Sequence, residues 1–237
     1  MRVFFILLIA LNLYAQNLIF YCGITMSKAM REIADNFEKE YNVKIEIIPG
    51  GSKSLLQTIK NTKKGDLYLP GSESYILKNK NLFTDYKYIG YNQLALIVKK
   101  GNPKQIKTIN DLLRNDVRVV LCNYKLSSCG KETKKVLKNK FWSVYDKSIE
   151  IVLDSTPLNE MVQTCADVGP NWKATLKRKN FAKTLEAIPI KNAKKHNLYL
   201  AVLQYSHNKQ LALKFMKYAA KQDKILKKYG FRDEIKK

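Results

Sequence analysis

The chain has 237 residues, of which 46% are hydrophobic, and its 43 lysine and arginine residues against 20 aspartate and glutamate residues give a net charge of +23. This composition excludes a disordered chain, and the length allows one large domain or two small ones. Lysine supplies 37 of the basic residues and is spread along the whole chain, so we expect attraction for small anions or an anionic membrane surface, and no nucleic-acid partner.

The N-terminal segment has the pattern of a secretory signal peptide. Arg2 precedes an apolar stretch over residues 3–13, which is short for a membrane span, and residues 13–15 resemble a signal-peptidase site. We therefore predict that residues 1–15 are removed on export and that a mature, periplasmic chain begins near Gln16. An uncleaved anchor is the alternative.

Hydrophobic periodicity predicts strands that alternate with helices along the rest of the chain. Runs with a period of two residues indicate strands, amphipathic runs indicate helices, and glycine and proline mark the turns. The predicted strands cover residues 18–22, 43–48, 66–69, 88–99, 117–122, 149–153, 167–171, 185–190 and 198–204. The predicted helices cover residues 27–41, 108–114, 131–138, 154–164, 208–221 and 223–228, with a further helix that begins near Ser52.

Two strand-to-helix junctions predict a binding site. The first passes through Gly23 and Thr25, and the second through Gly50, Gly51 and Ser52. Bare backbone N–H groups, a hydroxyl and the positive end of a helix dipole suit such a junction to an anion. Parallel strands bring both junctions to the same edge of a sheet. The pattern predicts capture of a small anion, with helix capping as the alternative role of each hydroxyl.

The alternation of strands and helices predicts an α/β fold with mainly parallel sheets. About ten strands are more than one small sheet usually holds, so we divide them between two lobes. The runs 88–99 and 198–204 are the predicted hinge segments. Lobe 1 would hold residues 16–93 plus 192–237, and lobe 2 residues 94–191.

The cysteine residues fit an oxidising compartment, and they allow three pairings if all are bridged. We predict one disulfide among the three that lie in the same half of the chain, with free buried thiols as the alternative. The sequence does not give the connectivity. The chain holds Cys22, Cys122, Cys129 and Cys165.

Catalytic and metal-binding motifs are absent from the sequence. It contains no C-x-x-C pair, no G-x-S-x-G elbow, no H-E-x-x-H and no phosphate-binding G-x-x-x-x-G-K loop. The two histidines, His196 and His207, lie in segments predicted to be at the surface. We therefore expect neither an enzyme nor a metal site.

The order of these motifs resembles that of a known family. The chain is similar to the bacterial periplasmic solute-binding proteins of the molybdate-binding type, the extracellular receptors of ABC importers. The resemblance covers nearly the whole mature chain. It rests on IFYCGITMSKAMREIADNFEKEYNVKIEI, PGGSKSLLQTI, KKGDLYLPGS, YNQLALIVKKGNP, ADVGPNWKAT and FMKYAAKQDKILKKYGF.

The resemblance implies a type II clamshell whose two lobes close on a tetrahedral oxyanion such as molybdate or tungstate. It implies neutral donors, no cofactor, an ABC permease in the inner membrane as partner, and a monomer. The family's two hydroxyl positions fall on Thr25 and Ser52. Its backbone donors fall near Cys129 and Leu158, and its aromatic hydroxyl falls on Trp172.

Departures from the family pattern leave the ligand open. Trp172 stands in place of a tyrosine, and Lys53 and Lys173 flank predicted site positions. A small phosphorylated or carboxylated organic acid is therefore the second candidate ligand, and an adhesin or colonisation factor with the same fold is the third hypothesis. Packing or backbone hydrogen bonding is the alternative role for Trp172 and for Tyr68, Tyr75, Asn92 and Gln93.

Overall fold

A computed structural model describes residues 17–153, 155–178 and 181–233 of the chain. The predicted signal peptide lies outside the described residues. Among the described residues, none of the helices combines the length and the apolar character that a membrane crossing requires.

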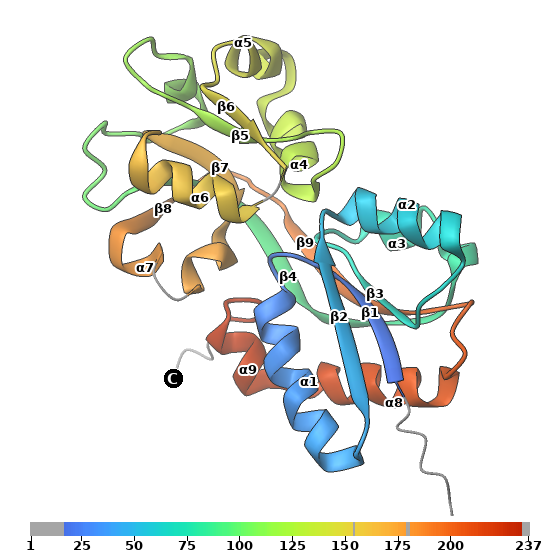
Figure 1. Cartoon of the computed structure of the whole chain (residues 1–237). Helices are drawn as coiled ribbons and strands as arrows, with labels where there is room; N and C mark the ends of the chain where they lie inside the picture. Colours follow the sequence, from blue (N-terminus) through green and yellow to red (C-terminus); the bar gives the residue numbers. More distant parts are fainter. Residues whose placement is uncertain (1–16, 154, 179–180, 234–237) are drawn as a thin grey trace, which may run out of the picture.

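The strands and helices alternate as the sequence predicts (Figure 1). The strands are β1 (Asn17–Gly23), β2 (Lys44–Gly50), β3 (Leu67–Leu69), β4 (Phe83–Lys99), β5 (Val120–Cys122), β6 (Glu150–Val152), β7 (Val168–Trp172), β8 (Leu185–Pro189) and β9 (Lys195–Leu203). The α-helices are α1 (Ser27–Tyr41), α2 (Ser52–Thr62), α3 (Ser74–Leu77), α4 (Ser128–Leu137), α5 (Phe141–Asp146), α6 (Ser155–Thr164), α7 (Phe181–Thr184), α8 (Lys209–Ala220) and α9 (Asp223–Lys228). Short 3-10 helices are η1 (Lys80–Leu82), η2 (Ile109–Leu113), η3 (Lys138–Lys140) and η4 (Lys173–Lys177).

The sheet is continuous through the molecule, in the order β2-β1-β3-β9-β4-β7, with β8 also paired to β4. Parallel pairing joins β1 to β2 and β3 in this sheet, and β5 to β6 in a separate two-stranded sheet. The long strands β4 and β9 instead pair antiparallel with each other and with their neighbours. Their direction has a simple cause, since β4 leads the chain out of the first group of elements and β9 brings it back.

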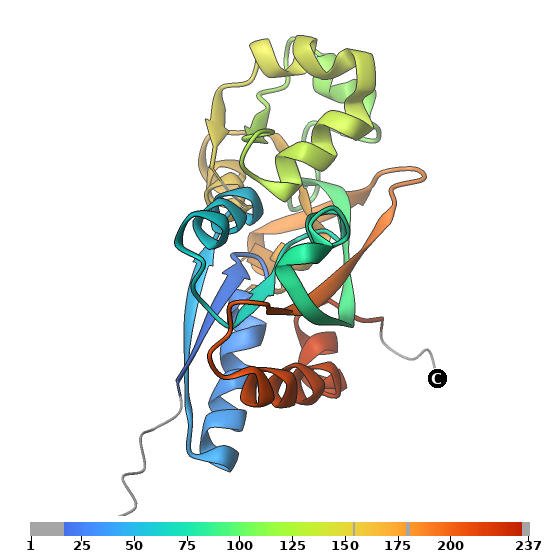
Figure 2. The same cartoon turned by 90° about the vertical axis from the view of Figure 1, so that its right-hand side faces the viewer.

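The first half of the molecule, as we call β1–β3 with α1–α3, α8 and α9, has one core on each face of its sheet. Along β1, Leu18 and Phe20 pack in the cluster that α1, α8 and α9 cover, whereas Tyr21 packs in the cluster under α2 and α3. This alternation follows from the period of two residues in a strand. Figure 1 and Figure 2 show the two helical layers on either side of the sheet.

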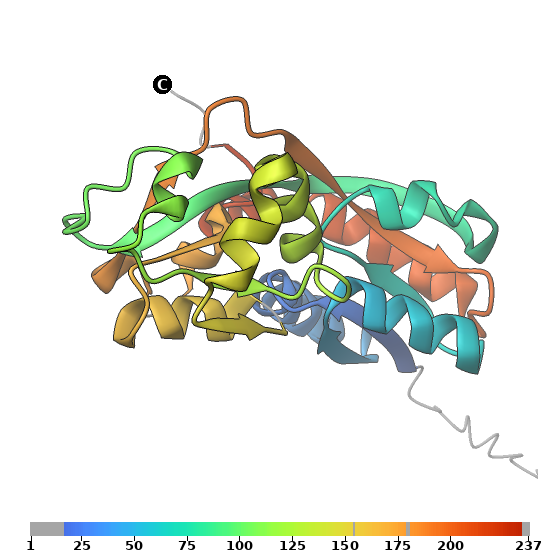
Figure 3. The same ribbon diagram turned by 90° about the horizontal axis from the view of Figure 1, so that it is seen from above.

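The second half, β5–β8 with α4–α7, packs around the other end of β4. Leu94 and Ile97 enter the cluster that includes Leu158 of α6, while Leu96 and Val98 enter the cluster that includes Phe141 of α5. Because β4 is buried on both faces here, its sequence reads as a continuous apolar run. Seen from above in Figure 3, β4 extends across both halves.

The predicted disulfide is not formed, which corrects the sequence-based expectation. Cys22, Cys129 and Cys165 are thiols, and the buried sulfur of Cys129 lies 3.2 Å from the carbonyl oxygen of Pro170.

Candidate functional site

A small cavity lies between the two halves, where helices from both begin. Its volume is about 10 Å³, which is room for about one water molecule. The first half contributes the ends of β1, β2 and β3, and the second half contributes the starts of α4 and α6. The cavity is lined by Gly23, Ile24, Thr25, Met26, Gly50, Gly51, Ser52, Gly71, Ser127, Ser128 and Ser155.

The starts of α1, α2 and α4 lie at this cavity. The N-cap residues of α1 and α2 are Met26 and Gly51, and neither helix has a side-chain cap. Within the described residues, the first turns of α1, α2 and α4 carry no aspartate or glutamate. Thr25 and Ser52 therefore do not cap these helices, and the capping alternative is wrong for both. The positive ends of the helix dipoles are available to an anion.

Hydroxyl groups supply the other polar atoms of the cavity. The Oγ of Ser52 accepts a hydrogen bond of 3.0 Å from the N–H of Gly71, and the Oγ of Ser127 accepts one of 3.2 Å from the N–H of Cys129. Since each hydroxyl also carries a proton, both serines can still donate to a ligand. Thr25 Oγ1 donates to Ser155 Oγ across the cavity at 3.3 Å.

Backbone contacts close the space around the hydroxyls. The N–H of Lys53 donates to the carbonyl oxygen of Leu126 at 3.3 Å, which joins α2 to the loop before α4. A Cβ on Gly71 would lie 2.3 Å from Oγ and 3.3 Å from Cβ of Ser128, so any larger residue would require Ser128 to shift. The cavity is thus formed by the contact of two halves.

Arg178 brings a positive charge to this contact, and sequence reasoning missed it. Its guanidinium donates to the carbonyl oxygen of Ile24 and to Thr156 Oγ1, and its Nη2 lies 3.5 Å from Ser27 Oγ. The residue is only 8% exposed. A lone arginine between lysines gives no sequence signal of such a position. Ile24 lines the cavity and Arg178 does not, so the charge lies behind the lining.

The structure brings together some of the predicted site residues and not others. Thr25 and Ser52 both line the cavity. Cys129 does not, because its N–H is taken by Ser127, and the side chain of Leu158 is buried against Gly169. Trp172 is 1% exposed and packs with its ring 5.8 Å from that of His196, outside the cavity lining.

Sequence reasoning also missed Ser127, Ser128 and Ser155. The available signal was the serine pair before the predicted helix at residue 131 and the Ser-Thr-Pro start of the next one. The family pattern pointed to backbone donors near Cys129 and Leu158, one to three residues further along each helix. At the cavity the structure places the side-chain hydroxyls of Ser127, Ser128 and Ser155.

The other polar candidates serve the backbone. Asn92 Nδ2 donates to the carbonyl oxygen of Gly71 at 3.2 Å, and Gln93 Nε2 donates to that of Ala193 at 3.0 Å. The buried Tyr68 packs in the sheet and donates to the carbonyl oxygen of Ser52 at 2.6 Å. Tyr75 is buried in the same core cluster. These four residues thus have the packing or backbone hydrogen-bonding role that the sequence left open as the alternative.

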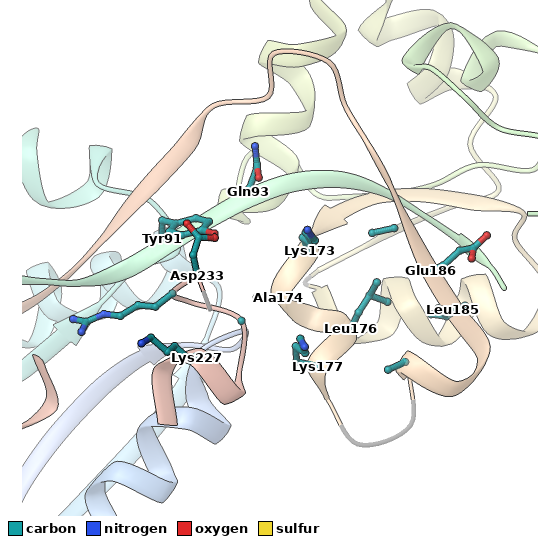
Figure 4. Close-up of a pocket in the computed structure, with 14 residues that line it drawn as sticks. Tyr91, Gln93, Lys173, Ala174, Leu176, Lys177, Leu185, Glu186, Lys227 and Asp233 are labelled. Atoms are coloured by element: carbon teal, nitrogen blue, oxygen red, sulfur yellow. The ribbon is translucent and has the colours of Figure 1, made fainter. Parts of the chain in front are cut away.

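The two lysines that flank the predicted site differ in position. Lys53 follows Ser52 and faces a groove between α2 and α4, whereas Lys173 lines a separate cavity of about 880 Å³. Figure 4 shows Lys173 and Lys177 on one side of that cavity, with Lys227 and Asp233 from the C-terminal segment on the other. The two cavities share no lining residues, so Lys173 does not supply charge to the hydroxyl cavity.

His196, which the sequence placed at the surface, is only 2% exposed. Its neighbours Lys195 and Asn197 are exposed, because successive residues of β9 point to opposite faces. No group of three or more histidine, cysteine, aspartate or glutamate side chains within the described ranges is placed to hold a metal ion.

Comparison with protein families gives one match along most of the chain. The model of a family described as bacterial extracellular solute-binding protein matches residues 18–232. A curated relative, a putative binding protein of Haemophilus influenzae, is 25% identical over 161 residues, which are 66% of this chain. The match spans 64% of the relative, just under two thirds of its length.

Solved structures share the fold at low sequence identity. The substrate-binding domain of a putative molybdenum ABC transporter from Clostridium difficile is 21% identical, with a TM-score of 0.65 over 92% of this chain and 99% of that one. The periplasmic molybdate-binding protein of Azotobacter vinelandii is 16% identical, with a TM-score of 0.75 over the same shares. PEB3, which is from Campylobacter jejuni, has a structure with L-phospholactate bound that is 18% identical, with a TM-score of 0.69 over 92% of this chain and 100% of that one. These likenesses show the periplasmic-binding-protein fold.

Proposed function

Because this chain belongs to the family of bacterial extracellular solute-binding proteins, which bind solutes and are not enzymes, we propose that it captures a small tetrahedral oxyanion between its halves and delivers it to an ABC importer. The observation that carries the proposal is the convergence of hydroxyls and helix N-termini from both halves on one buried cavity. Molybdate, tungstate, sulfate and phosphate are the candidate ligands. Export to the periplasm by the segment 1–15 belongs to the same proposal.

The strength of binding requires that many donors act together. A micromolar dissociation constant corresponds to about 8 kcal/mol. A helix terminus supplies about 0.3–1 kcal/mol, and a hydrogen bond to a charged group about 1.5–3 kcal/mol. Several hydroxyls and N–H groups in a site without water together supply this binding free energy, whereas one exposed strand-to-helix junction does not.

Capture requires the halves to move. The cavity of about 10 Å³ is too small for an oxyanion, so the halves must separate to admit one and must sit slightly further apart around it. We propose that residues 16–93 with 192–237 and residues 94–191 move as two lobes about β4 and β9. Apart from Ala174, the core clusters support this division, because each contains residues from only one of the two sets.

Calorimetry with the four oxyanions tests the proposal. We expect one or more to bind, and we expect Ser52→Ala to weaken binding by about 10- to 150-fold, because a donor to a charged ligand is lost. Ser54→Ala is the matched control, since Ser54 is exposed two residues further along α2. Absence of heat with all four anions would rule out an inorganic oxyanion as the ligand.

A small phosphorylated organic acid is the second candidate ligand. The observation that favours it is the buried guanidinium of Arg178 beside the cavity, which suits a second anionic group. The structure of PEB3 with L-phospholactate is consistent with such a ligand in this fold. Thermal-shift measurements with L-phospholactate and sulfate separate the candidates, since Arg178→Gln should weaken the organic acid more. Lys173→Ala, which removes a cation from the separate cavity, is the control.

A further inference from the structure

A buried histidine connects the two halves through two carboxylates. Glu73 lies in the first half, directly before α3, and Glu132 lies on α4 in the second half. His196, near the start of β9, lies between them. Its Nδ1 is 3.2 Å from Glu73 Oε2, and its Nε2 is 2.8 Å from Glu132 Oε1. The second contact is an ion-pair approach and not an aligned hydrogen bond.

The chemistry of imidazole decides the protonation that this geometry needs. A neutral imidazole has one N–H and one nitrogen lone pair, whereas an imidazolium has an N–H on each nitrogen. Both ring nitrogens of His196 face carboxylate oxygens, and the side chain is only 3% exposed. A neutral ring would carry no positive charge to pair with the two carboxylates, and one of its nitrogens would have no proton beside a carboxylate oxygen. The geometry therefore matches the imidazolium.

The surrounding charges fit the same state. Lys194 pairs with Glu73 at 2.9 Å and Lys135 pairs with Glu132 at 2.9 Å, so each carboxylate has one exposed partner besides the histidine. Lys131, on the same helix, and Lys194 also interact electrostatically with Glu132. Asn92 lies opposite His196 on β4, and the ring of Trp172 packs against the imidazole; neither carries a charge.

We infer that His196, as an imidazolium, is a clamp between Glu73 and Glu132 that holds the halves together, so that closure of the protein depends on pH. That the halves open and close around a solute rests on the proposed function. The clamp itself is a property of the chain without solute. Without the positive charge on His196 the two carboxylates lose the partner that they share, and the contact across the halves weakens.

The carboxylates set the acid limit of the clamp. Burial raises the pKa of Glu132, but its contacts with His196 and Lys135 outweigh burial and bring the pKa to about 2. The pKa of Glu73 is also lowered, since its contacts with Lys194 and His196 outweigh burial. A carboxyl with a depressed pKa stabilises the folded contact above its unfolded pKa of about 4.5 and loses that effect as the pH falls towards the folded value. Closure should therefore decline at both ends of the pH range.

Small-angle X-ray scattering of the chain without solute at pH 6 and pH 8.5 tests the clamp. We expect the open-to-closed ratio of the wild type to rise about tenfold or more at the higher pH, as a charged contact is lost. Glu132→Gln should stay closed at both pH values, because an amide can donate to a neutral ring. His196→Gln should show no alkaline change. Glu46→Gln and His207→Gln, at exposed positions, are the matched controls and should behave as the wild type.

Nitrogen NMR of the imidazole rings gives an independent readout. Only two histidines are present, so His196→Gln assigns both sets of signals. We expect both ring nitrogens of His196 to be protonated in the closed form at pH 6, and one proton to be lost as the scattering changes. A ring with one bare nitrogen in the closed form, or a Glu132→Gln variant that opens like the wild type, would overturn the inference. Because no solute is needed, failure of oxyanion binding would leave these results readable.

Discussion

At the scale of single residues, Gly71 decides how closely the halves can meet. An added Cβ would lie 2.3 Å from Oγ and 3.3 Å from Cβ of Ser128 in the opposite half. We predict that Gly71→Ala holds the halves apart. The strain of such a contact is about 1–3 kcal/mol, which corresponds to about a 5- to 150-fold loss of solute affinity. Calorimetry measures the affinity.

The same substitution should leave the fold of each half intact, because the clash is between halves. Thermal unfolding is therefore expected to change little. Ser128→Gly removes the opposing atoms. Gly71→Ala should therefore reduce the solute affinity less in the Ser128→Gly background than in the wild type. If Gly71→Ala binds the solute as tightly as the wild type, the halves do not close at this contact.

At the scale of elements, the start of α2 should serve the solute rather than its own stability. Ser54 is exposed in the first turn, and its Oγ would lie 3.7 Å from a Cβ on Gly51, which lines the cavity. We predict that Ser54→Glu stabilises the helix by about 0.3–1 kcal/mol, since an anion favours a helix N-terminus. The same charge repels an anionic solute, so affinity should fall by about two- to fivefold.

Thermal unfolding measures the predicted gain in stability, and calorimetry measures the predicted loss of solute affinity. Ser54→Gln is the control, because it has a similar size without the charge, and it should leave both quantities near the wild-type values. A Ser54→Glu variant with raised stability and unchanged affinity would show that the solute does not bind at the start of α2. The expected variant is more stable and binds more weakly, whereas a general loss of structure would lower both stability and affinity.

The elements show which parts of the fold the sequence could predict. Helix α1 was predicted with the bounds that the structure has, because buried Met30, Ile33 and Phe37 recur at helical spacing. The helix predicted over residues 108–114 is the 3-10 helix η2, which Thr108 caps in a capping box with Asp111. The first residues of β4 were missed, since those after Phe83 are exposed and carry no apolar pattern. Antiparallel pairing of β4 with β9 depends on contacts distant in sequence, which local periodicity does not encode.

The candidate site was predictable to a similar degree. Thr25 and Ser52 were predicted because glycine, a hydroxyl and a helix start occur together at local junctions. Arg178 was not, since two of its partners, Ile24 and Ser27, lie about 150 residues away in the other half. His196 could have been predicted as buried, because it alternates with Lys195 and Asn197 and precedes an apolar position in a strand pattern. The lysine-rich surroundings concealed that signal.

At the scale of the whole molecule, the positive charge should act on the rate of solute capture. A groove of about 440 Å³ between α2, α3 and α4 has six lysines and no acidic residue among its described lining residues. It opens between the two halves beside the start of α2. The lysines are Lys53, Lys60, Lys78, Lys125, Lys131 and Lys134. The pKa of Lys131 is lowered by burial and by neighbouring ammonium groups, among them those of Lys78 and Lys53 in the groove.

Such a concentration of one charge attracts anions from solution over a distance set by salt. The Debye length falls from about 30 Å at 0.01 M to about 8 Å at 0.15 M ionic strength. We therefore predict that the association rate constant of an oxyanion falls about tenfold or more over this range, while the dissociation rate constant hardly changes. Stopped-flow measurement of the two rate constants separates this steering from direct contacts in the closed site.

The position of the lysines, and not only the net charge of +23, should decide how strongly salt lowers the association rate constant. Replacement of Lys53 and Lys131 by glutamine removes two charges at the groove and should reduce the salt dependence of association. Replacement of Lys209 and Lys217, exposed on α8, removes the same charge elsewhere and should alter it less. Because field lines are focused by the groove, equal effects of the two pairs would show that the anion is drawn by the total charge alone.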